Sequence, residues 1–166
     1  MDPLAISRLT RSARIAKLLA MLPQSFADSV ATGDPLAVLQ AALAHFDCQT
    51  GTVHLMRDGA LRLAAHVNIP PPLLPIIDTV PIGKGIAGLA AERREAVSLC
   101  NLQTDTSGQA RPAAKQTGME GSVAVPMLAG TELRGVLGIA KTGAHDWSDA
   151  EKEVLSAFAN AFAERL

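Results

Sequence analysis

The stretch from Asp78 to Leu102, DTVPIGKGIAGLAAERREAVSLCNL, contains the strongest local signals in the chain. It begins with a short apolar run over Thr79–Ile82, which predicts a strand. A glycine turn follows, and the small residues after it are typical of a helix that packs closely on its neighbour. The apolar run over Ala96–Cys100 predicts a second strand. We therefore expect a strand, a glycine turn, a helix and a strand in this order.

Two helices are predicted ahead of this stretch. Asp2-Pro3 can begin the first, which we expect to reach about Met21. The polar segment Gln24–Gly33 predicts a connection. The second helix is expected from Asp34-Pro35 to about Asp47, because apolar residues recur there at helical spacing. The first helix carries the basic residues Arg8, Arg11, Arg14 and Lys17, and the apolar stripe of the second is Leu36, Leu39, Leu43 and Phe46.

The clearest hairpin is predicted over Gly51–Val67. Asp58-Gly59 separates its two halves, and a two-residue Asp-Gly loop favours a type I′ turn. The implied register pairs His54 with Leu63. Both faces of this hairpin are apolar, so we expect the sheet to be covered on both sides. The second face is expected to carry Val53, Leu55, Arg62, Ala64 and His66.

Two irregular segments lie on either side of the central stretch. Ile69–Pro75, IPPPLLP, predicts a stiff, lid-like loop because prolines disfavour strand and helix interiors. Gln103–Gly118 predicts a long polar loop, and such loops are often functional. A short helix is expected there over Ala110–Gln116, capped by Thr106, Ser107 or Gly108.

The end of the chain predicts a second hairpin and a closing helix. The hairpin is expected to consist of Ser122–Leu128 and Leu133–Lys141. Ser148 and Glu151 have the spacing of a capping box, which marks the start of the last helix. Its apolar stripe is wide enough to cover one face of a sheet.

Composition and charge exclude several classes of protein. The 166 residues suit one folded domain, with 48% apolar and 19% charged residues. An aromatic share of 3% and a net charge of −1 argue against direct nucleic-acid binding. No apolar run approaches the roughly 20 residues that span a bilayer, and the N-terminus lacks the layout of a secretory signal, so we expect a cytoplasmic protein with no membrane partner. Cys48 and Cys100 form neither a disulfide framework nor a metal pattern.

The order of these elements resembles that of a GAF domain. Three stretches carry the resemblance: VPIGKGIAGLAAERREAV, the pair SVAVPML and GVLGIAK, and WSDAEKEVLSAFANAFAERL. The resemblance implies an α+β fold with a central antiparallel sheet of about five or six strands. It places helices from both chain ends on one face and a ligand pocket under loops and short helices on the other. We expect residues 1–30 to form a packing or dimer helix with its connection, and residues 31–166 to form the domain.

The resemblance also implies a function. Members of this family bind cyclic nucleotides, bilins, haem, oxo-acids or inorganic anions, pair through their terminal helices, and signal to an effector. Because no effector segment follows here, we expect a homodimeric sensor of a small or anionic molecule that acts on a separate protein, such as a kinase or a transcription regulator. The sequence identifies no cofactor.

Two alternatives remain open at this point. One branch of the family is the free methionine sulfoxide reductase, a thiol enzyme. A cysteine of that branch matches Ala87 here, and Cys100 lies only near the place of another, so the thiol cluster is not reproduced. The other alternative is a pairing or scaffold domain with a collapsed pocket. We predict no catalytic residue and no metal ligand set.

Candidate ligand residues come from the central stretch and the loop after it. Arg111 and Lys115 stand four residues apart, which suits an anion or carboxylate, but a solvated face is the default use of such charges. His54 and His66 lie on the hairpin and are either ligand contacts or packed side chains. The hydroxyls of Thr104, Thr106 and Ser107 would assist Arg111, and Ile69, Ile86, Leu99 and Met119 would form apolar walls.

Overall fold

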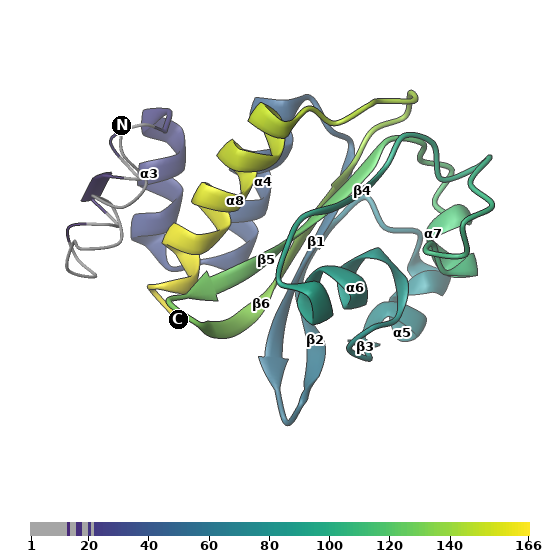
Figure 1. Ribbon diagram of the computed structural model, residues 1–166, viewed down its shortest axis with the longest axis horizontal. Helices are drawn as coiled ribbons and strands as arrows, with labels where there is room; N and C mark the ends of the chain where they lie inside the picture. The colour runs from purple at the N-terminus through teal and green to yellow at the C-terminus, as the bar shows by residue number, and fades with distance from the viewer. Residues whose placement is uncertain (1–12, 14–15, 18–19, 21) are drawn as a thin grey trace.

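The computed structural model describes residues 13, 16–17, 20 and 22–166. The helix predicted over residues 2–21 therefore lies largely outside the described residues. Within them, a six-stranded antiparallel sheet stands between two layers (Figure 1). Helices α4 and α8 cover one face, with α3 packed against both of them, and the short helices α5, α6 and α7 lie on the other. The predicted α+β fold, with terminal helices gathered on one face, is confirmed.

The sheet has the strand order β3-β2-β1-β6-β5-β4, and all neighbouring strands are antiparallel. The strands are β1 (Thr50–Arg57), β2 (Ala60–Val67), β3 (Thr79–Val80), β4 (Val97–Leu99), β5 (Ser122–Ala129) and β6 (Glu132–Ala140). The helices are α3 (Gln24–Thr32), α4 (Pro35–Phe46), η1 (Pro71–Leu73), α5 (Leu74–Ile77), α6 (Gly85–Arg93), α7 (Pro112–Lys115) and α8 (Asp149–Ala163).

The first hairpin has the predicted turn. Asp58 and Gly59 both have positive φ, 52° and 76°, as a type I′ turn requires. The register that this turn sets pairs His54 with Leu63, as predicted.

Beyond that pair the hairpin departs from the prediction. The register shifts between Val53 and His54, and Val53 faces Ala65. Ala65 is buried in the core beside Val53, so the prediction that Ala64 and His66 share this face is wrong. The cause is a one-residue irregularity in the pairing, which reverses the alternation of side chains and leaves no mark in the hydrophobic pattern.

The segment Gln24–Gly33, predicted as a connection, is mostly the helix α3. Phe26 and Val30 are buried one turn apart, and the Phe26 ring stacks on Phe158 of α8 with centroids 4.0 Å apart. Gly33 ends the helix with φ 68°. The prediction failed because so short a helix owes its stability to packing on its neighbours and not to its own largely polar sequence.

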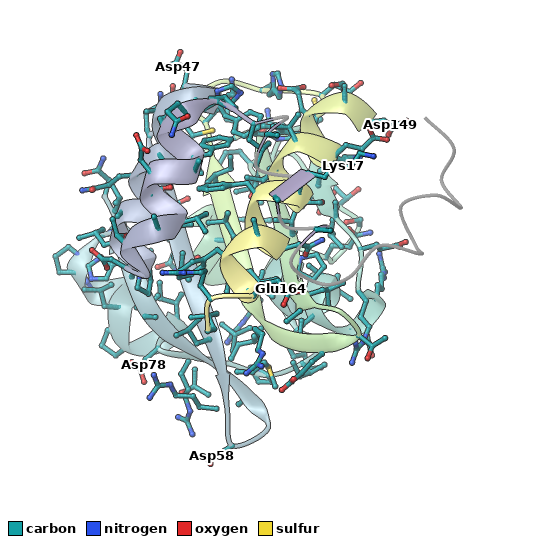
Figure 2. The ribbon with its side chains drawn as sticks, turned by 90° about the vertical axis from the view of Figure 1, so that its left-hand side faces the viewer. Lys17, Asp47, Asp58, Asp78, Asp149 and Glu164 are labelled. Carbon is teal, nitrogen blue, oxygen red and sulfur yellow. The ribbon has the colours of Figure 1, made fainter. Side chains whose placement is uncertain are left out.

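The two other helices on this face begin as predicted, and α4 also ends as predicted. The Asp34 side chain accepts a backbone N–H at the start of α4, and Asp47 ends that helix in a left-handed conformation. Ser148 and Glu151 form the capping box of α8. Figure 2 looks onto this helical face, with Asp47 at one end of α4 and Asp58 at the distant tip of the hairpin.

The other face differs from the prediction in two places. The proline-rich segment forms the short helices η1 and α5, because prolines are tolerated in a first helical turn where no N–H is needed. Helix α7 follows Arg111 as its N-cap, with no side-chain cap. The predicted caps Thr106, Ser107 and Gly108 all precede it.

Candidate functional site

A pocket of about 150 Å³ lies between the sheet and the short helices of the second face. Its floor is formed by β1, β5 and β6, and its roof by the chain from Ile69 to Ala87 together with Leu102 and α7. The polar segment beyond Leu102 therefore folds back over the sheet. The apolar part of the roof includes Ile69, Leu73, Ile77, Ile86, Leu102 and Ala113.

The floor is hollow because small residues stand opposite one another on three strands. In one row Thr52 pairs with Gly138, which pairs with Ala124. A Cβ atom added at Gly138 would find its nearest neighbour, Thr52 Oγ1, at 3.6 Å, so the space above Gly138 is open. The next row consists of Thr50, Ala140 and Ser122.

The side chain of Arg111 passes close to the glycine turn at this pocket. Gly85 has φ 67°, and a Cβ atom there would lie 2.9 Å from Cδ of Arg111. The positive φ favours glycine at this position, and the absence of a side chain lets the arginine stem pass close to the turn. Within the part of the chain that the structure describes, no carboxylate forms an ion pair with Arg111. Its guanidinium is available to an anion.

The first turn of α6 adds positive potential beside Arg111. Gly85, Ile86 and Ala87 line the pocket. The N-cap residue, Lys84, makes no side-chain capping bond, and the first backbone N–H groups of an α-helix have no partner within it. A helix start of this kind attracts negative charge. One end of the pocket therefore carries positive charge from Arg111 and from this helix start.

His54 lines the pocket from β1 and is only 3% exposed. Its Nε2 atom lies 2.8 Å from the carbonyl oxygen of Ile77 in the roof, so Nε2 carries the proton and donates it. Burial lowers the pKa of His54 below 6.5, although the bond to Ile77 and the nearby Asp78 carboxylate oppose this. The ring is therefore neutral near pH 7, and its buried Nδ1 has no hydrogen-bond partner among the described residues.

Of the predicted ligand residues, Arg111, Ile69 and Ile86 line this pocket. Thr104 and Thr106 are exposed and lie outside its lining. The exposed Ser107 donates to the Asp105 carboxylate, and Lys115 donates from Nζ to the Asp105 carbonyl oxygen. Leu99 and Met119 also lie outside the lining and pack against the core beside α6, and His66 is exposed opposite Thr52. Ligand binding by any of these residues stays a prediction.

Three hydroxyl-bearing residues, Thr50, Thr52 and Ser122, also line the pocket and were not predicted from the sequence. The signal was present as small residues at matching positions of three strands. These small residues can be recognised as one row only when the register of the strands is known, because β1 and β6 lie far apart in the chain.

Neither cysteine lines the pocket. Cys48 packs against the helical core, and burial raises the pKa of its thiol to about 12. Cys100 is exposed at the end of β4. The described residues contain no cluster of three or more His, Cys, Asp or Glu side chains that could hold a metal ion.

Known proteins with a similar sequence pattern or fold include several GAF domains. A family model described as GAF domain matches residues 36–166. A putative GAF sensor protein from Burkholderia vietnamiensis superposes with a TM-score of 0.70 at 15% identity, covering 95% of this chain and 96% of that one. The GAF domain of a phosphoenolpyruvate-protein phosphotransferase from Coxiella burnetii gives a TM-score of 0.70 at 18% identity, covering 93% of each chain.

A third solved structure is an enzyme, the free methionine-R-sulfoxide reductase from Neisseria meningitidis in complex with its substrate. It gives a TM-score of 0.69 at 16% identity, covering 95% of this chain and 90% of that one. No curated protein matches the sequence. At these identities the likenesses establish the fold alone. No helix in the described part of the chain has the length and hydrophobicity to cross a membrane.

Proposed function

We propose that this chain, which belongs to the GAF domain family, senses a small organic anion in the pocket between the sheet and the short helices. The observation that carries this proposal is the position of Arg111, which lines the pocket without a carboxylate partner among the described residues. A guanidinium with no internal partner is well suited to a carboxylate, which it can bind through two parallel hydrogen bonds.

The volume of the pocket limits the size of the ligand. A cavity of about 150 Å³ is comparable to one that binds benzene. The ligand would thus have about six to ten non-hydrogen atoms. Among the ligands expected from the family resemblance, haem, bilins and cyclic nucleotides exceed this size. Oxo-acids and inorganic anions remain by size, and the apolar lining favours the organic acids.

The charge of the pocket supports the same class. Arg111 and the uncapped first turn of α6 meet at one end, where the stem of Arg111 crosses Gly85. Elsewhere the lining is apolar apart from His54 and a few hydroxyls. A molecule with one carboxylate and a short, mostly apolar body matches a pocket that has one charged end and an otherwise apolar lining.

A route for the signal exists through the sheet. Ser122 and Ala124 of β5 form part of the pocket floor, while the other face of β5 packs against α8. A ligand that shifts β5 or orders the roof would change the packing of α8. We propose that the terminal helices report this change to a second copy of the chain or to a separate effector protein.

The sulfoxide reductase alternative is less well supported by this site. That chemistry needs a reactive thiolate at the substrate, and a thiol with a pKa of about 12 is protonated near neutral pH. Cys48 faces the helical core and Cys100 is exposed, so neither thiol reaches the pocket lining. The open pocket likewise argues against a domain used only for pairing.

The proposal is tested by titration calorimetry with a small carboxylate such as butanoate. Arg111→Ala should weaken binding by a factor of ten or more, about 1.4 kcal/mol, because it removes the only guanidinium that the described residues contribute to the lining. Lys115→Ala is the matched control, since it removes the same charge four residues away and Lys115 is held by Asp105. Equal effects of the two variants, or none from Arg111→Ala, would contradict the proposed role of Arg111.

A further inference from the structure

We infer that Thr50 determines which small acids this pocket prefers. Its hydroxyl would form a hydrogen bond with a second oxygen of the ligand, an alcohol or a ketone, while Arg111 holds the carboxylate. The pocket would then prefer acids that carry such an oxygen to unsubstituted acids of the same length. This inference rests on the proposed function, because it names the class of ligand for the same pocket.

The first step is the direction of the Thr50 side chain. Side chains alternate between the two faces of a strand, and β1 pairs with β6 without a register shift from Thr50 to Leu55. Val53 is buried in the helical core, and a Cβ atom at Gly51 would lie 2.7 Å from Cδ1 of Leu39 in α4. These two residues face the helices, so Thr50 faces the other way, into the pocket that it lines.

The second step is the missing partner. Thr50 is only 5% exposed, and no described residue forms a hydrogen bond with its hydroxyl. Within the described chain, the unpartnered side-chain nitrogen and oxygen atoms that have no accessible surface belong to His54, Arg134 and Trp147. Oγ1 of Thr50 is not among them, so a ligand in the pocket can reach it. A buried hydroxyl without a partner is unfavourable, and a hydrogen bond to the ligand would remove this penalty.

The third step concerns the reason for a hydroxyl at this position. Valine has nearly the shape of threonine and suits a strand equally well, so neither packing nor strand formation accounts for the polar atom of Thr50. Ser122 lies in the same row, across Ala140 from Thr50, and its hydroxyl also has no partner among the described residues. The hydroxyls of this row are therefore available to a ligand and do not hold the sheet together.

The fourth step is the chemistry that a hydroxyl recognises. The hydroxyl of Thr50 donates one hydrogen bond and also accepts, so it pairs with an alcohol or a ketone oxygen. An unsubstituted acid brings only methylene or methyl groups to this position and leaves the hydroxyl unpaired. The selectivity is therefore between acids with and without a second oxygen.

Titration calorimetry on the full chain tests this preference by comparing butanoate with 2-, 3- and 4-hydroxybutanoate and with 2-oxobutanoate. At least one of the oxygen-bearing acids should bind about tenfold more tightly than butanoate, and that acid reports the spacing between the carboxylate and Thr50. If none of them exceeds butanoate while butanoate binding still depends on Arg111, the inference is overturned and the proposed function stands. If no acid binds at all, both fail.

Three variants locate the effect at Thr50. Thr50→Val removes the hydroxyl and keeps the shape of the side chain, so the affinity ratio of the preferred acid to butanoate should fall to about one. Thr50→Ser keeps the hydroxyl and should keep the ratio. Thr142→Val removes an exposed hydroxyl outside the lining and should also leave the ratio unchanged. A ratio that persists in Thr50→Val would overturn the inference.

A measurement on the wild-type chain decides the question even if Thr50→Val does not fold. Methyl NMR of labelled threonine follows this side chain directly, and the Thr50 signal is assigned by its absence from Thr50→Ser. The signal should move further on saturation with the preferred acid than on saturation with butanoate, because only the preferred acid engages the hydroxyl. An equal response to both acids, or no response to either, would overturn the inference.

Discussion

His54 connects the two halves of the site through one side chain. Its ring stands on β1 in the pocket floor, and its Nε2–H group is bonded to Ile77 in the roof. Burial keeps the ring neutral and holds its pKa below 6.5. A charged ring at this position would be poorly solvated and would place a second N–H against the apolar lining.

The lowered pKa of His54 predicts a pH dependence of folding stability. Above about pH 6.5 the ring is neutral in both the folded and the unfolded chain, so no change is expected. As the pH falls below 6.5, the unfolded chain takes up a proton that the folded chain does not, and the free energy of unfolding should decrease. Urea denaturation at about pH 7.5 and about pH 5.5 measures this loss, which His54→Gln should reduce.

Glu151 also has a shifted pKa, but it titrates at lower pH than the two values compared in this test. Burial would raise the pKa of Glu151, but hydrogen bonds from the Ser148 N–H and from His145 lower it below 4.5. Its contribution is therefore lost at lower pH than that of His54. An equal loss of stability in the wild type and in His54→Gln between the two pH values would show that His54 is not the titrating group.

Single residues were the hardest part of the site to predict. Arg111 could be identified because a cation near helix starts and hydroxyls suggests an anion site. Thr50 and Ser122 could not, because what places them together is pairing between strands distant in sequence. The buried acceptor of His54 depends on the bond to Ile77, which no sequence pattern encodes.

Among the elements, the turn into α6 does most to shape the site. The N–H of Gly83 donates to the Gly88 carbonyl at 2.8 Å, which folds the turn back onto the helix. A Cβ atom at Gly88 would lie 2.5 Å from the Pro81 carbonyl oxygen. This close backbone contact holds the first turn of α6 beside the pocket.

The variant Gly88→Ala tests this packing. Alanine is the better helix former by about 1 kcal/mol, so propensity alone predicts a gain. The contact with Pro81 should outweigh it and destabilise the protein by about 1–3 kcal/mol, because the clashing atom belongs to the backbone. Gly143→Ala is the control: no atom lies within 4 Å of its added Cβ, and its effect should stay within about 0.5 kcal/mol. Thermal unfolding compares the two, and a Gly88→Ala protein as stable as the wild type would contradict this account.

The elements with strong local signals were predicted, and those that depend on packing were not. The Asp58-Gly59 turn and the Ser148–Glu151 capping box fix their structures through nearby backbone geometry. Helix α3 and the register shift near Val53 are decided by contacts with other elements. The short helices η1 and α5 show that prolines, which exclude a helix interior, still permit a first turn.

At the scale of the whole molecule, the sheet separates two hydrophobic cores, one densely filled and one beside the pocket. The larger core lies under α3, α4 and α8 and is filled by large side chains such as Phe26, Phe158 and Phe162. The opposite face has small residues at its centre and a roof of short helices. The two apolar faces of the first hairpin predicted that both sides of the sheet are covered, and the resemblance to a GAF domain implied that helices from the chain ends lie on one side.

The open floor at Gly138 allows the central claim to be tested without removing a polar group. Gly138→Val would project its side chain into the pocket, and the first added carbon meets nothing closer than Thr52 Oγ1 at 3.6 Å. The fold should therefore persist while the space for a ligand of about six to ten non-hydrogen atoms is lost. Unfolding midpoints would verify that the variant remains folded.

Native mass spectrometry of both proteins, after incubation with a mixture of butanoate and its hydroxy isomers, tests the account most directly. We predict one bound acid on the wild-type chain and none on Gly138→Val. The same adduct on both proteins would place the ligand outside the pocket, and no adduct on either would remove the small-anion sensor from consideration.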